Sequence, residues 1–296
     1  MKKNTYILGA LFVVLLLIAF LVLQKPGEQS ASSASTGTMF SIDSLSVDKI
    51  EIKATNSTVV LEKRGSEWFV AQPINYKADQ ATVGQCIHQV KVLEVKSIVS
   101  SKPEKHSVFH VDTAGISVRL FEKGTKESAF ILGKMAGGYS EYYVRKANTD
   151  DVLLSEGAYS YSFNRALKDW RDKSIMTIPK ESITDIRYQY GDTTFIVAMK
   201  DSVWRVNNDR AQQSVVDGIL TSLSNFQADD FIDSSLAPKV MATIVYANVQ
   251  IRFSFDKSAN KYYVQSSNSP QWYVVEQWKA NQVLKRKKEI VEAVKK

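Results

Sequence analysis

The chain has 296 residues, of which 44% are hydrophobic and 23% charged, a composition typical of globular proteins and sufficient for one large or two ordinary domains. Its formal net charge is +7, but most of the excess lies in Lys2, Lys3 and the C-terminal tail 285–296. A nucleic-acid-binding protein needs a basic footprint across one face, so we expect no nucleic-acid partner. The single cysteine, Cys86, cannot form an internal disulfide or a multi-cysteine metal site.

The first apolar segment predicts a membrane anchor. Residues Tyr6–Leu23 include no charged side chain, and a helix of this length, at about 1.5 Å per residue, spans the hydrocarbon core. Lys2 and Lys3 precede it, so the positive-inside rule places residues 1–5 in the cytoplasm. A cleaved signal peptide is the alternative, with a small-residue site at Ser30–Ser35, but its apolar region is usually about 7–15 residues. We therefore expect a single-pass protein of the bacterial inner membrane with a periplasmic body.

A linker and two copies of a repeat follow the anchor. Residues 24–40 are rich in serine, glycine and alanine, which predicts a flexible linker. The rest of the sequence divides into two similar α+β copies, 41–176 and 177–296, of which the second is more divergent. Each copy opens with three short strands, and Trp68 and Trp204 occupy equivalent positions that we expect to pack in the core.

A helix follows these strands in each copy, because apolar residues recur at helical spacing. They are Val83, Cys86, Ile87, Val90 and Leu93 in the first copy, and Val216, Ile219, Leu220, Leu223 and Phe226 in the second. More strands and a second helix, at 158–170 and 277–294, complete each copy. The order predicts an α+β fold: two tandem copies of a mainly antiparallel sheet with helices on one face, preceded by one transmembrane helix.

The first copy contains several short motifs in a definite order. They are Asp48–Ile52, Val60–Lys63, Glu67-Trp68, Ala78-Asp79-Gln80, Leu132-Gly133-Lys134, Tyr142–Arg145 and Trp170–Lys173. Together they resemble the bacterial domain-of-unknown-function family 4340 over 42–174. One departure is Phe109-His110-Val111-Asp112, where the family usually has Phe-Gly-Leu-Asp, so the local turn is in question.

The resemblance implies a function only through the neighbouring genes of family members. The family has no established activity, its members are typically membrane-anchored, and their genes often lie beside ABC transporter components of the gliding-motility type. This implies an accessory role in an envelope transport complex, with ABC transporter subunits as partners.

Three residues at the end of the first copy are candidates for an interaction or for the joint between the repeats: Trp170, Arg171 and Asp172. One interpretation is an ion pair and a cap that fix the joint. The other is a contact with a partner protein.

Other reactive residues do not indicate a catalytic, cofactor-binding or metal site. Cys86 lies on the apolar stripe, where a thiol behaves as a small hydrophobic side chain. His106 and His110 have the spacing of a helical zinc pair, but no third ligand is obvious, so we interpret them as solvated loop histidines. The segment with Leu132-Gly133-Lys134 and Gly137-Gly138 lacks Walker spacing, and we interpret it as a hairpin connection. We expect no cofactor, and the sequence identifies no small-molecule ligand.

Three functions stay open. The first is a non-enzymatic accessory or interaction subunit of an envelope transport complex of the ABC type. The second is a binding module for a cell-envelope glycan or lipid, suggested by the aromatic residues Tyr139, Tyr142, Tyr159, Tyr161 and Trp272. The third is a hydrolase with an unrecognised site, although no pair of carboxylates stands out. The basic C-terminal helix either touches anionic lipid or packs on the second copy with its basic face in water.

Overall fold

A computed structural model of the protein describes residues 37–54, 57–138, 140–157, 160–233 and 238–292. The predicted anchor Tyr6–Leu23 and the predicted cytoplasmic stub 1–5 lie outside these residues. Within the described ranges, no helix is long and apolar enough to cross a membrane. The chain divides into two compact units, Met1–Arg171 and Asp172–Lys296.

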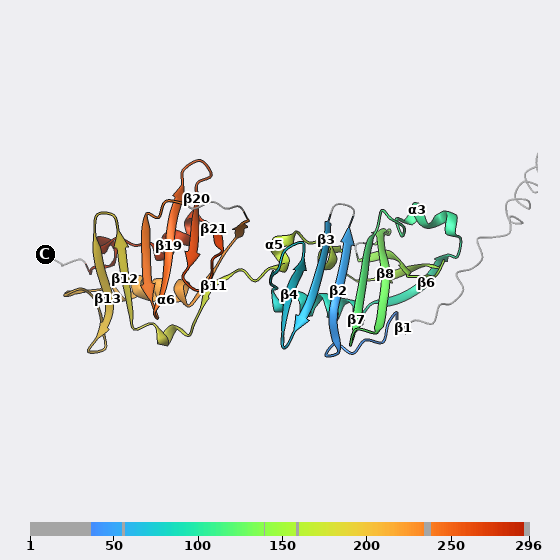
Figure 1. The fold of residues 1–296 in the computed structure, drawn as a ribbon, viewed down its shortest axis with the longest axis horizontal. Helices are drawn as coiled ribbons and strands as arrows, with labels where there is room; N and C mark the ends of the chain where they lie inside the picture. Colours follow the sequence, from blue (N-terminus) through green and yellow to red (C-terminus); the bar gives the residue numbers. More distant parts are fainter. Residues whose placement is uncertain (1–36, 55–56, 139, 158–159, 234–237, 293–296) are drawn as a thin grey trace, which may run out of the picture. The chain divides into compact units, whose positions relative to one another are not determined.

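The first unit is built on a large antiparallel sheet, to which ten of its described strands belong (Figure 1). These are β1 (Gly37–Thr38), β2 (Val47–Ala54), β3 (Ser57–Arg64), β4 (Glu67–Gln72), β5 (Tyr76–Lys77), β6 (Glu94–Ser100), β7 (Ile116–Glu122), β8 (Lys126–Met135), β9 (Glu141–Lys146) and β10 (Val152–Glu156). Their order across the sheet is β1-β6-β10-β9-β8-β7-β2-β3-β4-β5.

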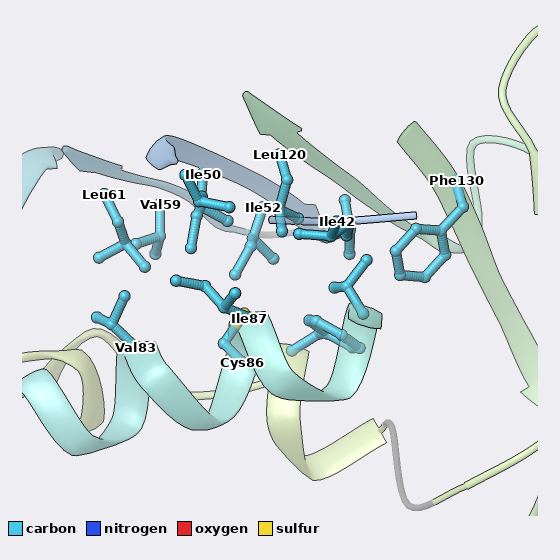
Figure 2. Packing of buried hydrophobic residues seen from close by; sticks show 14 of the residues in the cluster. Ile42, Ile50, Ile52, Val59, Leu61, Val83, Cys86, Ile87, Leu120 and Phe130 are labelled. Atoms are coloured by element: carbon cyan, nitrogen blue, oxygen red, sulfur yellow. The ribbon is translucent and has the colours of Figure 1, made fainter. Parts of the chain in front are cut away.

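One helix supplies much of the core of this unit. Helix α2 (Gln80–Lys91) buries the predicted stripe, including Val83, Cys86 and Ile87, against apolar side chains of the strands. Figure 2 shows these residues facing Ile50 and Leu61 across the core. Burial of one such aliphatic side chain contributes about 1.5–3 kcal/mol. Alternating exposure along β2 leaves its other side chains on the opposite face of the sheet.

The second unit repeats this arrangement. Its elements are β11 (Ser174–Thr177), β12 (Asp185–Tyr190), β13 (Thr194–Lys200), β14 (Val203–Val206), β15 (Asp209–Arg210), α6 (Gln213–Ser224), β16 (Asn225–Gln227), β17 (Asp230–Ile232), β18 (Ala242–Tyr246), β19 (Val249–Asp256), β20 (Lys261–Ser266), β21 (Trp272–Glu276), α7 (Gln277–Val283) and α8 (Lys287–Ile290). Nine of these described strands form the order β15-β14-β13-β12-β18-β19-β20-β21-β17, and β11 pairs with β16.

The two sheets match strand by strand. Read from the other edge, the first sheet runs β5-β4-β3-β2-β7-β8-β9-β10-β6 and then β1. The first nine strands have the order of the second sheet with each strand replaced by its counterpart, and β1 is additional. Trp68 and Trp204 lie at equivalent positions of β4 and β14 and are both buried, as predicted. The fold is thus mainly antiparallel β with few helices, in two large sheets.

The start of each unit differs from the sequence expectation. Residues 37–40 belong to the expected flexible linker, yet Gly37–Thr38 pairs with β6 and Phe40 is buried. In the second unit, Ser174–Thr177 pairs with β16, which draws residues expected at the end of the first copy into the second unit. Backbone pairing with the segment after the central helix explains both differences.

The second helix of each copy is shorter than predicted. The expected helix 158–170 is two short helices, α4 (Ser160–Phe163) and α5 (Leu167–Trp170), and the expected helix 277–294 is α7 and α8. Ala166 and Arg286 have extended backbones at the two breaks. Tertiary hydrogen bonds stabilise the second break, because the hydroxyls of Tyr188 and Tyr190 donate to the Val283 and Lys285 carbonyls at 3.1 and 2.8 Å.

These buried tyrosines predict a pH dependence. Burial raises the pKa of Tyr188 and Tyr190 above the usual value near 10. In the unfolded chain both hydroxyls ionise near pH 10, whereas in the folded chain they stay protonated to higher pH. Their contribution to the free energy of unfolding is therefore complete below pH 10. It is lost as the pH rises from there toward the folded-state pKa, by about 1.4 kcal/mol per pH unit and per group. We expect Tyr188→Phe to lower stability at pH 8 but to make the loss above pH 10 shallower in urea titrations of the full-length protein. Tyr161→Phe, at an exposed site, is the control, and an unchanged slope in Tyr188→Phe would contradict the prediction.

Candidate functional site

The candidate residues Trp170 and Arg171 lie at the end of α5, inside the first unit. Trp170 has 0% and Arg171 2% of its surface exposed. The backbone N–H of Asp79, just before α2, donates to the carbonyl of Trp170 at 2.9 Å, and Arg171 forms an isolated β-bridge with Ala78. The Arg171 guanidinium lies 4.4 Å from the centroid of the Tyr76 ring, a cation–π geometry that stabilises a buried cation.

The start of α2 completes this cluster. The Asp79 carboxylate accepts from the backbone N–H of Thr82 at 2.6 Å and so caps the helix. The Gln80 amide accepts from the Trp68 N–H at 2.8 Å and donates to the Ala78 carbonyl at 2.7 Å. The structure therefore brings together three motifs, Glu67-Trp68, Ala78-Asp79-Gln80 and Trp170-Arg171, of which the last is far from the other two in the sequence. We call Trp68, Tyr76, Ala78–Gln80, Trp170 and Arg171 the closure cluster.

The closure cluster has a backbone counterpart in the second unit. There, the N–H of Ala211 donates to the Trp204 carbonyl at 2.9 Å and that of Gln212 to the Ile290 carbonyl at 2.7 Å. Ala211 also bridges to Val291. Ile290 and Val291 therefore occupy the places of Trp170 and Arg171. The backbone hydrogen bonds are the same in both units, but the second unit has aliphatic side chains where the first has an aromatic and a cationic one.

The third candidate, Asp172, is the first residue of the second unit. Its carboxylate accepts from the N–H of Ser174 at 2.9 Å, a local turn next to β11. The inward orientation of Trp170 and Arg171 suits a structural role, since a partner could reach them only after local opening. Their assignment as a joint or an interaction site stays a prediction.

The other reactive residues lie as follows. Cys86 is buried, and desolvation raises the pKa of its thiol to about 12, which agrees with the core interpretation. His106 donates through Nε2 to the Asp150 carbonyl at 2.9 Å, and His110 follows the end of α3 (His106–Phe109). In the ranges that the structure describes, no three His, Cys, Asp or Glu residues form a group that could hold a metal ion.

The Leu132-Gly133-Lys134 motif lies within strand β8, so its interpretation as a hairpin connection is wrong, whereas Gly137-Gly138 lies in the connection between β8 and β9, as predicted. The connection between α3 and β7 packs over it. A Cβ on Gly133 would overlap the Phe109 carbonyl oxygen and lie 2.8 Å from the Val111 Cγ1. Glycine is needed here because a backbone segment approaches the strand too closely for any side chain.

His110 holds the turn that the family usually builds with glycine. Its φ of 56° is in the left-handed region, which glycine adopts without strain. The Val111 N–H still bonds to the His106 carbonyl at 3.0 Å, and the Val111 carbonyl accepts from Arg145 Nε at 2.8 Å. His110 therefore adopts the left-handed conformation in this turn, with the Val111 backbone hydrogen-bonded on both sides.

Two hollows lie on the second unit. One of about 600 Å³ lies beside α6 and is lined by Asp217, Gly218, Ser222, Gln282 and Lys285, among others. Gly218 is the counterpart of Gln85 on α2, whose side chain accepts from Arg165 at 3.0 Å in the first unit. The second hollow, about 370 Å³, is lined by Arg252, Gln265 and the turn 266–270.

Two of the proposed ligand-binding aromatics, Tyr139 and Tyr159, lie outside the described residues.

The fold and the closure cluster define a class of protein: a mainly antiparallel β protein made of two similar units, each with a central helix tied to the end of its own chain segment. A comparison with protein families matches residues 68–243 to the domain of unknown function DUF4340. This match covers more than half of the chain, so the protein belongs to the DUF4340 family. The resemblance is confirmed, and the match extends beyond 174 into the second unit. Comparisons with curated proteins and with solved structures find no match.

The two helix starts offer a paired test of the cap. We expect Asp79→Ala to lower the free energy of unfolding by about 1 kcal/mol, because it removes the side-chain cap of α2. Gln212 occupies the same position before α6 and makes no side-chain cap bond, so Gln212→Ala should change stability by only a few tenths of that amount. Urea denaturation of the full-length variants measures both, and equal losses would contradict the assigned cap.

Gly133 offers a second test. We expect Gly133→Ala to cost about 1–3 kcal/mol, because the new methyl group overlaps the backbone of the segment above β8. Gly84 is the control: it lies on α2, and no atom lies within 4 Å of the position that its methyl group would take, so Gly84→Ala should stabilise the helix by about 0.5–1 kcal/mol. If Gly133→Ala proved neutral in thermal unfolding, the close approach would be wrong.

Proposed function

We propose that this protein is a non-enzymatic interaction subunit of an envelope complex, in which the two sheets present surfaces to other proteins. The observation that carries the proposal is that side chains alternate between a buried and an exposed face along strands such as β2 and β12. Each sheet is large, and interfaces of stable complexes typically bury about 800 Å² per partner, an area that such a face can supply.

The arrangement of the family motifs supports this role. The closure cluster and Gly133 use their side chains to hold strands, helix and loop together. Residues that serve the fold in this way make a rigid platform, and a rigid platform lowers the entropy lost on binding.

We propose further that the body lies on the periplasmic side of the inner membrane and that ABC transporter subunits are its partners. The location follows from the apolar segment Tyr6–Leu23 with its preceding lysines. The partner class follows from the gene association that the family resemblance implies.

Crosslinking in cells tests the proposal. We expect tagged full-length protein to capture membrane-transport components reproducibly after crosslinking and gentle detergent extraction, as identified by mass spectrometry. Cells with the untagged protein provide the background. If the tagged protein is recovered alone at every crosslinker length, the interaction role is refuted.

The second candidate function, binding of a cell-envelope glycan or lipid, would then gain weight. The observation that favours it is the hollow of about 600 Å³ beside α6, whose lining includes Ser214, Thr221 and Ser222. Hydroxyl groups of this kind suit a polar ligand.

A further inference from the structure

The exposed face of the second sheet bears arginines without matching carboxylates. The hydroxyl of Tyr246 on β18 donates to the Leu223 carbonyl at 3.2 Å, which shows that this side chain points toward α6. Val245, next to it in the strand, therefore points to the opposite face. Arg187 pairs with Val245, and Arg252 pairs with Thr243 on the same strand, so both arginines lie on this opposite face.

Two neighbouring rows of paired residues cross this face. One row is Ile196, Arg187, Val245 and Gln250, and the next is Thr194, Gln189, Thr243, Arg252 and Gln265. Neither row contains a carboxylate. We call Arg187, Arg252 and their neighbours Ile196, Val245, Gln250 and Gln265 the arginine face.

The two arginines keep their charge available. The Arg187 side chain is exposed and makes no hydrogen bond or ion pair with any residue that the structure describes. Arg252 is exposed as well, and it donates to neutral amide oxygens, those of Gln265 at 3.4 Å and Gln250 at 3.1 Å. Amide oxygens orient a guanidinium without neutralising it, so the group stays ready for an anion.

The first unit shows what a neutralised version of this face looks like. Arg187 corresponds to Glu51, which forms ion pairs with Lys49 at 2.7 Å and Arg119 at 2.8 Å. Arg119 also pairs with Glu127 at 2.7 Å. Glu51 thus lies in a network in which acids and bases neutralise one another, whereas the second sheet has an arginine in place of this central acid.

We propose that the arginine face binds an acidic, extended segment of a partner protein. The inference rests on the proposed interaction role and adds the chemistry of the partner. Arg187 and Arg252 lie in adjacent rows, on strands that have β18 between them. Two strand spacings across the sheet and two residues along it place their Cα atoms about 12 Å apart. Carboxylates four residues apart in an extended segment are about 13 Å apart, which matches this spacing. Guanidinium groups bind carboxylates through two parallel hydrogen bonds.

The surroundings favour a peptide over a lipid surface. The hollow of about 370 Å³ beside Arg252 has room for a side chain of a bound peptide. A flat bilayer surface has no side chain to place there. Acidic residues also flank the arginines on this face: Asp185 pairs with Ala198 on one side, and Asp256 pairs with Lys261 on the other. Arg205 lies beyond Ala198 in the row of Asp185, and Lys261 lies in the row of Asp256, so charges of both signs surround the two arginines. Such a mixed surface attracts an anionic membrane less than a uniformly basic face would.

Fluorescence anisotropy tests the inference with the full-length protein in detergent at low salt. The probe is a fluorescein-labelled peptide of three Glu-Ser-Gly-Ser repeats, which places a glutamate at every fourth residue, and its Gln-Ser-Gly-Ser analogue is the reference. We expect the glutamate peptide to bind more tightly than the analogue and to lose at least about tenfold in affinity in the Arg187→Glu/Arg252→Glu variant. A matched variant, Lys53→Glu/Lys134→Glu, reverses two exposed charges on β2 and β8 of the first sheet and should lose less than about threefold.

Each other outcome overturns the inference. Equal losses in the two variants mean unspecific charge attraction, and no preference for the glutamate peptide means no acidic-segment site. Binding of phosphatidylglycerol vesicles through Arg187 and Arg252, without peptide binding, assigns the face to a lipid surface. If the charge reversals prevent folding, as seen by circular dichroism, Arg187→Gln/Arg252→Gln replaces them with the same expected direction. Capture of a partner by crosslinking together with failure of peptide binding would refute this inference and leave the interaction role intact.

Discussion

Each unit depends on a pair of backbone hydrogen bonds that ties its central helix to the end of its own chain segment. In the first unit, Asp79 N–H reaches the Trp170 carbonyl, and in the second, Gln212 N–H reaches that of Ile290, at 2.9 and 2.7 Å. The residue before each of these donors also bonds to a buried tryptophan of the fourth strand, Trp68 or Trp204. The start of the helix is thereby fixed to the sheet and to the last residues of the unit at once. A helix held at this point can bury its apolar stripe in one register, which explains how α2 and α6 take the same place in divergent sequences.

Sequence periodicity is sufficient to predict the elements that depend on local pattern. The stripe around Val83 and the one around Val216 are buried as expected, and the strands of both copies pair in the predicted antiparallel manner. The breaks in the closing helices escape such a prediction because their causes are tertiary. The hydroxyls of Tyr188 and Tyr190 bind carbonyls at the end of α7, and no helical periodicity in 277–294 reveals such partners.

The candidate site is only partly predictable for the same reason. The motif order singles out Trp170 and Arg171, but their burial and the contact of Arg171 with Tyr76 depend on residues almost one hundred positions earlier in the chain. Gly133 is recognisable as part of a motif, and its sequence context favours a turn, because a glycine between strands usually marks one. Glycine is required at this position because the backbone of Phe109 crosses above β8. Sequence spacing does not reveal such a long-range contact.

Duplication of the fold leaves the two copies with the same backbone bonds and different side-chain chemistry. The first copy places Trp170 and Arg171 at its closure, where the second has Ile290 and Val291. Aliphatic residues can fill this position because the backbone bonds, rather than the aromatic or cationic groups, make the closure. The second copy has Arg187 where the first has Glu51, the central acid of an ion network, and the positive charge of Arg187 is exposed. A scaffold whose stability comes from backbone pairing and a buried stripe tolerates such changes on its open face. That tolerance allows one copy to have a neutralised ion network where the other has exposed arginines.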